Sequence, residues 1–204
     1  MGMDISTERA LLERCQRGER RAYEPIVRGH EERLLDFLFW MTGNEEDARD
    51  LAQETFVRAW RKLASYDTSR PFRAWLFAIA RNKFRDFKRA RNANPVLGAS
   101  RIDRVAPFPD PKPIPDDQLL LKERKERVWA ALHRLRPLES EALILRDIQD
   151  FSYGQIAEIL NVPEGTAASR IHNARRAFRK AWEELVPALV DTPISHSGGL
   201  PAYP

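Results

Sequence analysis

Apolar residues recur at intervals of three and four positions along most of this 204-residue chain, which is the spacing of an amphipathic helix. The sequence lacks strand-like alternation bounded by turn pairs, and glycine is scarce, at nine residues. The pattern therefore predicts an all-α protein. Helices are expected at about residues 6–18, 19–41, 44–65, 71–91, 117–135, 137–148, 152–160 and 163–186.

Capping residues support several of these helix ends. Ser6 can cap the first helix and Gly18 can end it, because glycine readily adopts the backbone that closes a helix. Gly43 breaks the second helix, and Asn44 is a favourable cap for the third. Residues 66–71, with the sequence YDTSRP, are then expected to form a loop ahead of the fourth helix.

A proline-rich segment interrupts the helical pattern near the middle of the chain. Residues 92–117 contain six prolines, and from Pro107 to Pro115 every second residue is proline. Proline has no amide hydrogen and a fixed backbone angle, so this segment should be an extended, semi-rigid linker. It divides the chain into two small helical domains. The expected divisions are a first domain at 1–92, a linker at 93–117, a second domain at 118–187 and a disordered tail at 188–204.

The second domain contains the pattern of a helix-turn-helix. Ser152 and Gln155 have capping-box spacing ahead of a short apolar helix. Asn161 tolerates a left-handed backbone and Pro163 suits a helix's first turn, so residues 161–163 predict a tight turn before a longer helix. This unit places its second helix in the major groove of DNA.

The two faces of that longer helix differ in chemistry. At 100° per residue, one face collects apolar side chains for the core: Ala167, Ile171, Ala174, Phe178 and Trp182. The opposite face collects groups suited to base edges: Gly165, Ser169, His172, Asn173 and Arg176. Arg170, Arg175 and Arg179 flank this face, and the stretch 165–182 has five bases and no acid. The alternative interpretation is an ordinary solvated helix in a bundle.

The first domain has a basic helix of its own, at residues 70–91, with eight bases and one acid. One stripe of this helix is basic with a single ring: Arg73, Phe77, Arg81, Arg85 and Lys88. Asn82 and Arg89 lie beside it. Such a stripe suits a single strand, because charge follows the phosphates and rings stack on unpaired bases. The preceding loop, 66–72, could hold a base flipped from the duplex.

The aromatic residues of this helix have two possible roles, in the core or at nucleic acid. Four of them are expected to be mostly core: Phe72, Trp75, Phe84 and Phe87. A role in nucleic-acid binding is favoured for Phe77, Arg81 and Asn82.

An acidic segment stands out in this basic chain. From Glu45 to Glu54 there are five acids and one base. Acids in a first turn stabilise the helix dipole, and that effect alone is a sufficient alternative explanation for residues 44–47. Asp50 and Glu54 lie beyond the reach of that effect, which favours a basic partner protein for this helix.

Overall composition indicates the cellular compartment of the protein. Lys and Arg number 34 against 30 Asp and Glu, for a net charge of +4 and a pI near 9.4. A single cysteine, Cys15, excludes an internal disulfide. The N-terminus lacks the apolar core of a signal peptide, and no apolar stretch is long enough to span a bilayer. A cytoplasmic protein without membrane insertion is expected.

The sequence carries no recognisable catalytic motif. Its four histidines are scattered, and HExxH, paired Cys/His spacing, Walker and GxGxxG patterns do not occur. The chain is therefore predicted to be no enzyme and to have no catalytic residue, no metal site and no cofactor.

With these pieces placed, residues 8–185 resemble a sigma factor of the extracytoplasmic-function group of the sigma-70 superfamily. The matching stretches are EEDARDLAQETFVRAWRKLASYD, FRAWLFAIARNKFRDFKR and LRPLESEALILRDIQDFSYGQIAEILNVPEGTAASRIHNARRAF. The resemblance implies two domains, region 2 and region 4, joined by a linker near the RNA exit path. It implies that the chain directs promoter-specific initiation by core RNA polymerase, which supplies the chemistry.

The resemblance also implies three sets of contacts. The beta-prime clamp helices of polymerase would meet Asp47, Asp50, Leu51, Gln53, Glu54, Phe56 and Trp60. The melted −10 element would meet Tyr66, Asp67, Ser69, Arg70, Phe72, Arg73, Phe77, Arg81, Asn82, Arg85 and Lys88. The duplex −35 element would meet Gly165, Thr166, Ser169, Arg170, His172, Asn173 and Arg176. Further expected partners are the beta flap of polymerase and an anti-sigma factor.

The chain departs from the family at two positions of the recognition helix. Ala168 and Asn173 stand where family members often carry a base, so −35 affinity could be modest or the sequence bound unusual. Two other functions stay open at this point. One is a sigma-like mimic that sequesters an anti-sigma factor, and the other is a stand-alone helix-turn-helix regulator.

Overall fold

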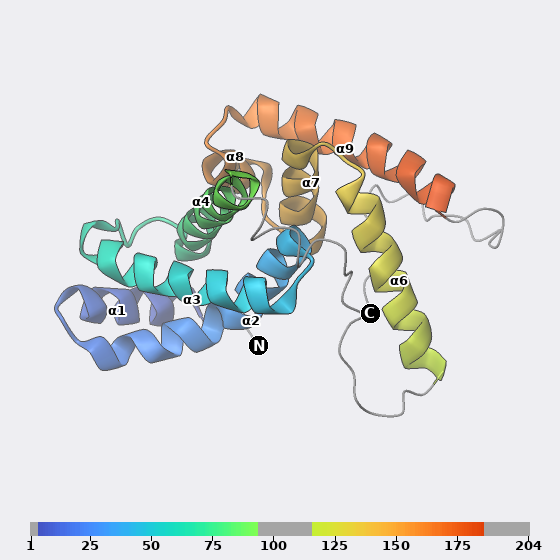
Figure 1. Ribbon diagram of the computed structural model, residues 1–204. Coiled ribbons are helices and arrows are strands. Elements are labelled where there is room, and N and C mark those ends of the chain that lie inside the picture. Colours follow the sequence, from blue (N-terminus) through green and yellow to red (C-terminus); the bar gives the residue numbers. More distant parts are fainter. Residues whose placement is uncertain (1–3, 94–115, 186–204) are drawn as a thin grey trace. The chain divides into compact units, whose positions relative to one another are not determined.

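The computed structural model of the chain describes residues 4–93 and 116–185 (Figure 1). The chain divides into two compact units, residues 1–105 and 106–204. Within the described ranges every regular element is a helix, which confirms the predicted fold class. The predicted tail lies outside the described residues, as does the predicted linker apart from residue 93 and residues 116–117.

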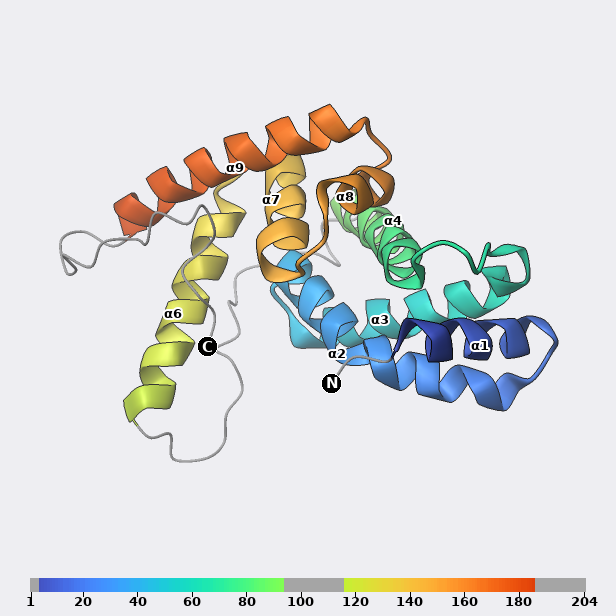
Figure 2. The ribbon, with the colours of Figure 1, turned by 180° about the vertical axis from the view of Figure 1, so that it is seen from behind.

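The first unit is a packed group of helices seen from two sides in Figure 1 and Figure 2. Helix α2 packs against α3, α4 packs against both, and α1 packs against α2. Short 3₁₀ turns, η1 and η2, precede α2 and follow α3. The bounds are α1 (Ile5–Gln16), η1 (Arg20–Ala22), α2 (Tyr23–Thr42), α3 (Glu45–Lys62), η2 (Leu63–Ser65) and α4 (Phe72–Ala93).

Large aromatic rings join α2 to α4 in the core of this unit. Phe37 of α2 and Phe77 of α4 are both 0% exposed, and their ring centroids are 5.1 Å apart. Helix α3 faces this core with small residues such as Ala48 and Ala59, which lets its backbone approach closely. The position of α4 is therefore fixed by rings that cannot shift without opening a cavity.

The first helix begins differently from the prediction. Its N-cap is Asp4 rather than Ser6, and the Asp4 carboxylate accepts hydrogen bonds from the amides of Ser6 and Thr7. The Ser6 hydroxyl also donates to this carboxylate, and these bonds lower the pKa of Asp4. A carboxylate accepts amide hydrogens more strongly than a hydroxyl does, so the earlier residue caps the helix.

The junctions around α2 combine one correction with one confirmation. The second helix starts at Tyr23 rather than residue 19, because a separate 3₁₀ turn follows Gly18, whose φ is +93°. At the other end Gly43 has φ 70° and closes α2 as predicted. Asn44 then caps α3 as predicted, its side-chain oxygen accepting from the Asp47 amide at 2.9 Å.

The second unit is organised around its last helix. Helix α9 packs against α6, α7 and α8. The bounds are α6 (Asp116–His133), α7 (Pro137–Leu143), the π-helical segment η3 (Ile144–Ile148), α8 (Tyr153–Leu160) and α9 (Glu164–Leu185).

Helices α8 and α9 form the predicted helix-turn-helix. Ser152 and Gln155 make the reciprocal bonds of a capping box. Asn161 is left-handed, with φ 52° and ψ 57°, and closes α8. Pro163 lies one residue ahead of α9 rather than in its first turn, and its carbonyl accepts from the amides of Thr166 and Ala167.

The segment before this motif differs from the single helix predicted at 137–148. After α7 the chain widens into η3, in which the Gln149 amide donates to the Ile144 carbonyl at 3.0 Å, five residues back. Apolar spacing does not distinguish this wider turn from an α-helical one, since both bury Ile144 and Leu145.

We predict that Asn44→Ala lowers the free energy of unfolding by about 1 kcal/mol, because an amide at the start of α3 loses its acceptor. Urea unfolding followed by tryptophan fluorescence measures this. The control is Asn92→Ala, at an exposed position near the end of α4. Equal midpoints for the two variants would contradict the assigned cap.

Candidate protein and nucleic-acid interfaces

The acidic residues of α3 divide into exposed and buried ones. Asp50 and Glu54 are exposed, and among the described residues Asp50 forms no ion pair. Glu54 lies 2.5 Å from the ammonium of Lys83 on α4, so part of its charge is balanced within the unit. Asp50 therefore presents the more open negative charge.

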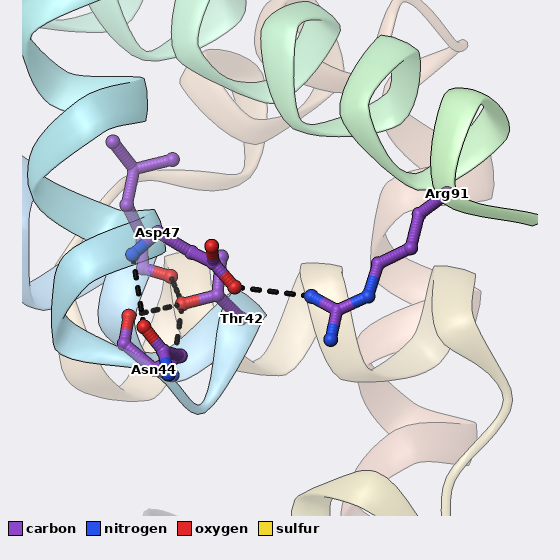
Figure 3. Close-up of polar contacts among 5 residues, drawn as sticks. Thr42, Asn44, Asp47 and Arg91 are labelled. Carbon is purple, nitrogen blue, oxygen red and sulfur yellow. Dashed lines mark hydrogen bonds and ion pairs between the residues drawn. The ribbon is translucent and has the colours of Figure 1, made fainter. Parts of the chain in front are cut away.

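Asp47 does not belong to the exposed acidic face, contrary to the expectation from the sequence. It is 4% exposed, and its Oδ2 lies 3.0 Å from Nη1 of Arg91 at the end of α4 (Figure 3). Thr42 and Asn44 sit beside it, with the Asn44 amide donating to the Thr42 hydroxyl. The pair thus joins the end of α4 to the junction between α2 and α3.

A groove of about 580 Å³ runs between α2 and α3. Trp60 is half-buried in its wall, with its ring centroid 5.0 Å from that of Tyr23. The Tyr23 hydroxyl donates to the Phe56 carbonyl at 2.8 Å, and Val57 is 45% exposed. The lining residues are Tyr23, Val27, Glu31, Leu35, Arg49, Ala52, Gln53, Phe56, Val57 and Trp60.

This groove brings together part of the predicted polymerase-binding set. Gln53, Phe56 and Trp60 line it, whereas Leu51 faces the core at 4% exposure. The contribution of α2 was missed from the sequence. A second row of apolar residues on α2, at Tyr23, Val27 and Leu35, could have indicated this contribution. That row lies on a different side of the helix from the buried row at Ile26, His30, Leu34 and Phe37.

The basic helix α4 exposes a narrower stripe than predicted. Phe77 and Arg81 are 0% and 4% exposed, so neither side chain is available at the surface. Asn82, Arg85 and Lys88 are exposed. Arg73 is half-buried, with its guanidinium 5.5 Å from the Phe77 ring centroid.

The burial of Phe77 and Arg81 has a geometric cause. Residues four apart on a helix are displaced by about 40° around its axis, so a stripe at spacing four drifts toward the neighbouring face. Because α4 packs against both α2 and α3, its buried arc is wide and includes the middle of that stripe. Phe72 and Phe84 are buried as expected, and Trp75 and Phe87 are half-buried.

The loop before α4 is held in place by its own rings. Tyr66 is 6% exposed, with its ring 4.5 Å from that of Trp75 and 5.6 Å from that of Phe72, and its hydroxyl donates to the Arg70 carbonyl. Tyr66 and Phe72 therefore form the floor of the loop. Asp67, Ser69 and Arg70 form its exposed part.

A turn within the loop shapes that exposed part. The Ser69 amide donates to Asp67 Oδ1 at 2.9 Å, and the bonds from Ser69 lower the pKa of Asp67. Asp67 thus stays ionised and close to the backbone.

Helix α1 supports the same loop, which the sequence did not indicate. The side-chain amide of Gln16 donates to the carbonyls of Leu63 at 2.9 Å and Tyr66 at 2.7 Å. At the other end of the loop, the His30 ring lies 5.3 Å from that of Phe72 and 2.6 Å from a carboxylate oxygen of Glu8. Both ends of the loop are thus tied to α1 or to a residue that α1 contacts.

The recognition helix α9 has the two faces predicted from its sequence. Ala167, Ile171, Ala174 and Phe178 are buried, and Trp182 is half-buried. The predicted duplex-facing residues are all accessible, as exposed or half-buried side chains: Gly165, Thr166, Ser169, Arg170, His172, Asn173 and Arg176. Arg175, predicted to flank this face, instead pairs with Asp147 of η3.

None of the helices in the described ranges is long and apolar enough to cross a membrane. Within residues 4–93 and 116–185 no three His, Cys, Asp or Glu side chains gather as metal ligands.

Comparison with known proteins identifies both units. The family model of sigma-70 region 2 matches residues 26–94, and that of sigma-70 region 4 matches residues 125–178. The chain is 31% identical over 172 residues to the RNA polymerase sigma factor CnrH of Cupriavidus metallidurans, covering 82% of this chain and 90% of that protein. It is 29% identical over 181 residues to the ECF sigma factor SigW of Bacillus subtilis, covering 85% and 96%.

A solved structure supports the same assignment. The sigma factor RpoE of Bartonella quintana, in complex with the anti-sigma factor NepR, is similar with a TM-score of 0.65 and 28% identity, covering 79% of this chain and 96% of that one. The pairing of region 2 with region 4 is that of an alternative RNA polymerase sigma factor, a protein of transcription initiation. The chain belongs to the extracytoplasmic-function group of the sigma-70 family.

We predict that Arg91→Ala lowers the free energy of unfolding of the first unit by about 3 kcal/mol, because it removes the guanidinium that lies 3.0 Å from the buried Asp47 carboxylate. Urea unfolding measures this. Arg89→Ala is the control, since Arg89 is 80% exposed and its ion pair with Asp86 should be worth less than about 1 kcal/mol. A decrease no larger than that of the control would contradict a structural role for the pair.

Proposed function

We propose that the chain binds core RNA polymerase through the groove between α2 and α3 and the exposed acids beside it. The supporting observation is the combination of an apolar groove containing Trp60 and Phe56 with the open charge of Asp50 on the same helix. Trp60 is half-buried and Phe56 is 8% exposed in this groove, and aromatic side chains in a pocket are common anchors of a protein interface. Exposed acids on the same helix favour a basic partner and disfavour DNA.

The partner at this groove is taken to be the beta-prime clamp helices of polymerase. Asp50, Gln53, Glu54, Phe56 and Trp60 are the proposed contacts. Leu51 would contribute indirectly, because its buried side chain holds α3 against the core. Asp47 is assigned to the internal ion pair with Arg91. The beta flap is the proposed partner of the second unit.

We assign capture of the −10 single strand to the exposed part of α4 and the loop before it. The proposed contacts are Asp67, Ser69, Arg70, Arg73, Asn82, Arg85 and Lys88, all exposed or half-buried. Tyr66, Phe72 and Phe77 would shape the site from below, and Arg81 is assigned to the packing of α4. Strand capture would then rest on charge and amide groups, with binding energy offsetting the cost of opening the duplex.

The −35 duplex is assigned to the outer face of α9. Ser169, His172 and Asn173 are exposed with hydrogen-bonding groups, and Arg176 adds a charge beside them. Gly165, Thr166 and Arg170 complete the proposed set near the start of the helix.

Regulation by an anti-sigma factor is part of the proposal. The similar RpoE structure is a complex with such a factor. A partner of this kind would cover the polymerase and DNA surfaces of both units. The protein would act in the cytoplasm beside polymerase and would contribute no catalytic group or cofactor.

Run-off transcription tests the proposed function. Transcript starts mapped after overproduction supply a template, and the purified chain with core polymerase should start RNA there. A mimic of a sigma factor would start none. A stand-alone regulator would shift the template without polymerase.

We predict that Asp50→Arg with Glu54→Arg weakens binding to core polymerase by about 100-fold or more, since the charges at the groove are reversed. Co-purification with core enzyme measures this, and circular dichroism should be unchanged. Glu183→Arg with Glu184→Arg, at the exposed end of α9, is the control with the same charge change. Equal retention of both double variants by polymerase would contradict the proposal.

We predict that Arg85→Ala with Lys88→Ala spares polymerase binding but impairs promoter opening. It should also lower the salt slope of strand binding by about 0.7 for each phosphate that is no longer neutralised. Permanganate footprinting of the promoter complex reports the opening. Arg20→Ala with Arg21→Ala removes the same charge from exposed positions outside α4. A footprint as strong as that of this control would refute the assignment of α4.

A further inference from the structure

Arg175 is set apart from the other bases of the recognition helix by its ion pair with Asp147. Its Nε and Nη2 donate to the two carboxylate oxygens of Asp147 at 3.1 and 2.6 Å. The Arg175 side chain is 31% exposed and that of Asp147 is 5% exposed. Hydrogen bonding to Asp147 raises the pKa of Arg175. By contrast, Arg176 is exposed and forms no ion pair within the described ranges.

Asp147 is held by an unusual piece of backbone. It lies in η3, whose wider turn adds a residue and so changes the direction in which following side chains leave the helix. The chain after η3 is fixed as well. The Phe151 amide donates to the Leu145 carbonyl at 3.0 Å, and Arg146 donates to the Phe151 carbonyl at 2.9 Å. Asp147 is therefore attached to a rigid support.

The buried face of α9 combines short and long apolar side chains. Ala167, Ala174 and Ala181 are buried beside Ile171 and Phe178, and the alanine side chains interlock less with neighbouring helices than the two larger ones do. A directional polar pair therefore adds to the rotational restraint that the apolar contacts give. A rotation of roughly 20° about the axis would move side-chain ends by about 2 Å, given a helix radius of about 5–6 Å. That displacement is enough to break hydrogen bonds to base edges.

We propose that Asp147 and Arg175 are positioning residues that fix the rotation of α9 about its axis, and that Arg175 makes no contact with DNA phosphate. A bidentate carboxylate–guanidinium pair is planar and directional, which is what a rotational stop requires. The pair joins η3, ahead of the helix-turn-helix, to the middle of the recognition helix. The inference rests on the proposed binding of duplex DNA by α9.

Salt dependence separates this role from a phosphate contact. Removing one phosphate contact weakens binding to all sequences equally and lowers the salt slope by about one. Removing a rotational stop weakens binding to the preferred sequence only and leaves the slope unchanged. Arg175→Lys is the most informative variant, because lysine keeps a charge for phosphate but cannot form the planar fork.

The test uses the full chain with core polymerase and two duplexes. One duplex is selected from random DNA by the wild-type complex, and the other is an unselected duplex of equal length. We expect Arg175→Lys and Asp147→Asn to weaken affinity for the selected duplex by about 10- to 100-fold, as removal of one base-edge hydrogen-bonded pair does. Affinity for the unselected duplex and both salt slopes should match wild type. Arg179→Ala is the comparison for a phosphate contact, because Arg179 is exposed and flanks the base-facing side of α9, and its slope should be lower by about one.

A second variant controls for loss of folding. Asp147→Leu with Arg175→Met replaces the pair by apolar side chains, which commonly preserves stability. The single variants should lower the urea midpoint. The double variant should have the wild-type midpoint and still show no preference for the selected duplex. Recovery of that preference together with stability would overturn the positioning role.

Two other outcomes would also overturn the proposal. One is wild-type affinity of Arg175→Lys together with a lower slope for Arg175→Met, which is the signature of a phosphate contact. The other is failure of the wild-type complex to select any duplex, which would contradict the proposed function itself. In that case the stability of the paired variants still shows whether the two side chains are coupled, because urea unfolding needs no DNA.

Discussion

A carboxylate that is removed from water needs a cation beside it, and the described residues of each unit include such a pair. In the first unit Asp47 of α3 pairs with Arg91 of α4. In the second unit Asp147 of η3 pairs with Arg175 of α9. In both cases the base comes from the helix that also carries the exposed basic groups, so one side of each helix is anchored while the other is left for a partner.

This arrangement separates structural charge from functional charge. The net charge of +4 gives little indication of where the protein binds, since several acids and bases neutralise one another inside the units or along one helix. The charged side chains that stay exposed are separated by sign. Asp50 is exposed on α3, one of the two helices that line the groove, whereas Arg85, Lys88 and Arg176 are exposed on two other helices. A factor that has to hold a protein and a nucleic acid together benefits from such separation.

The sequence was sufficient for features that depend on neighbouring residues. The caps at Asn44 and Ser152, the left-handed residues Gly43 and Asn161, and the two faces of α9 all follow from local chemistry, and the structure has each of them. The resemblance to sigma factors was carried by motifs in both domains, and the family matches confirm it.

Features that depend on tertiary contacts could not be predicted in the same way. Phe77 and Arg81 lie at the edge of an apolar stripe, and only the packing of α4 against two helices places them inside. Asp47 resembles an ordinary first-turn acid until Arg91 approaches it from a position 44 residues later. The groove needs α2 and α3 side by side, and the π-helical turn at η3 has the same apolar spacing as an α-helix.

The two hydrogen bonds from the Gln16 side chain bear on how much of the chain region 2 needs to keep its structure. The two carbonyls that it contacts belong to Leu63 of η2 and to Tyr66 at the start of the loop before α4, yet Gln16 precedes residue 26, where the match to region 2 starts. A fragment trimmed to that match would retain the loop and lose the helix that braces it. The structural boundary of the first unit therefore lies upstream of residue 26, at α1.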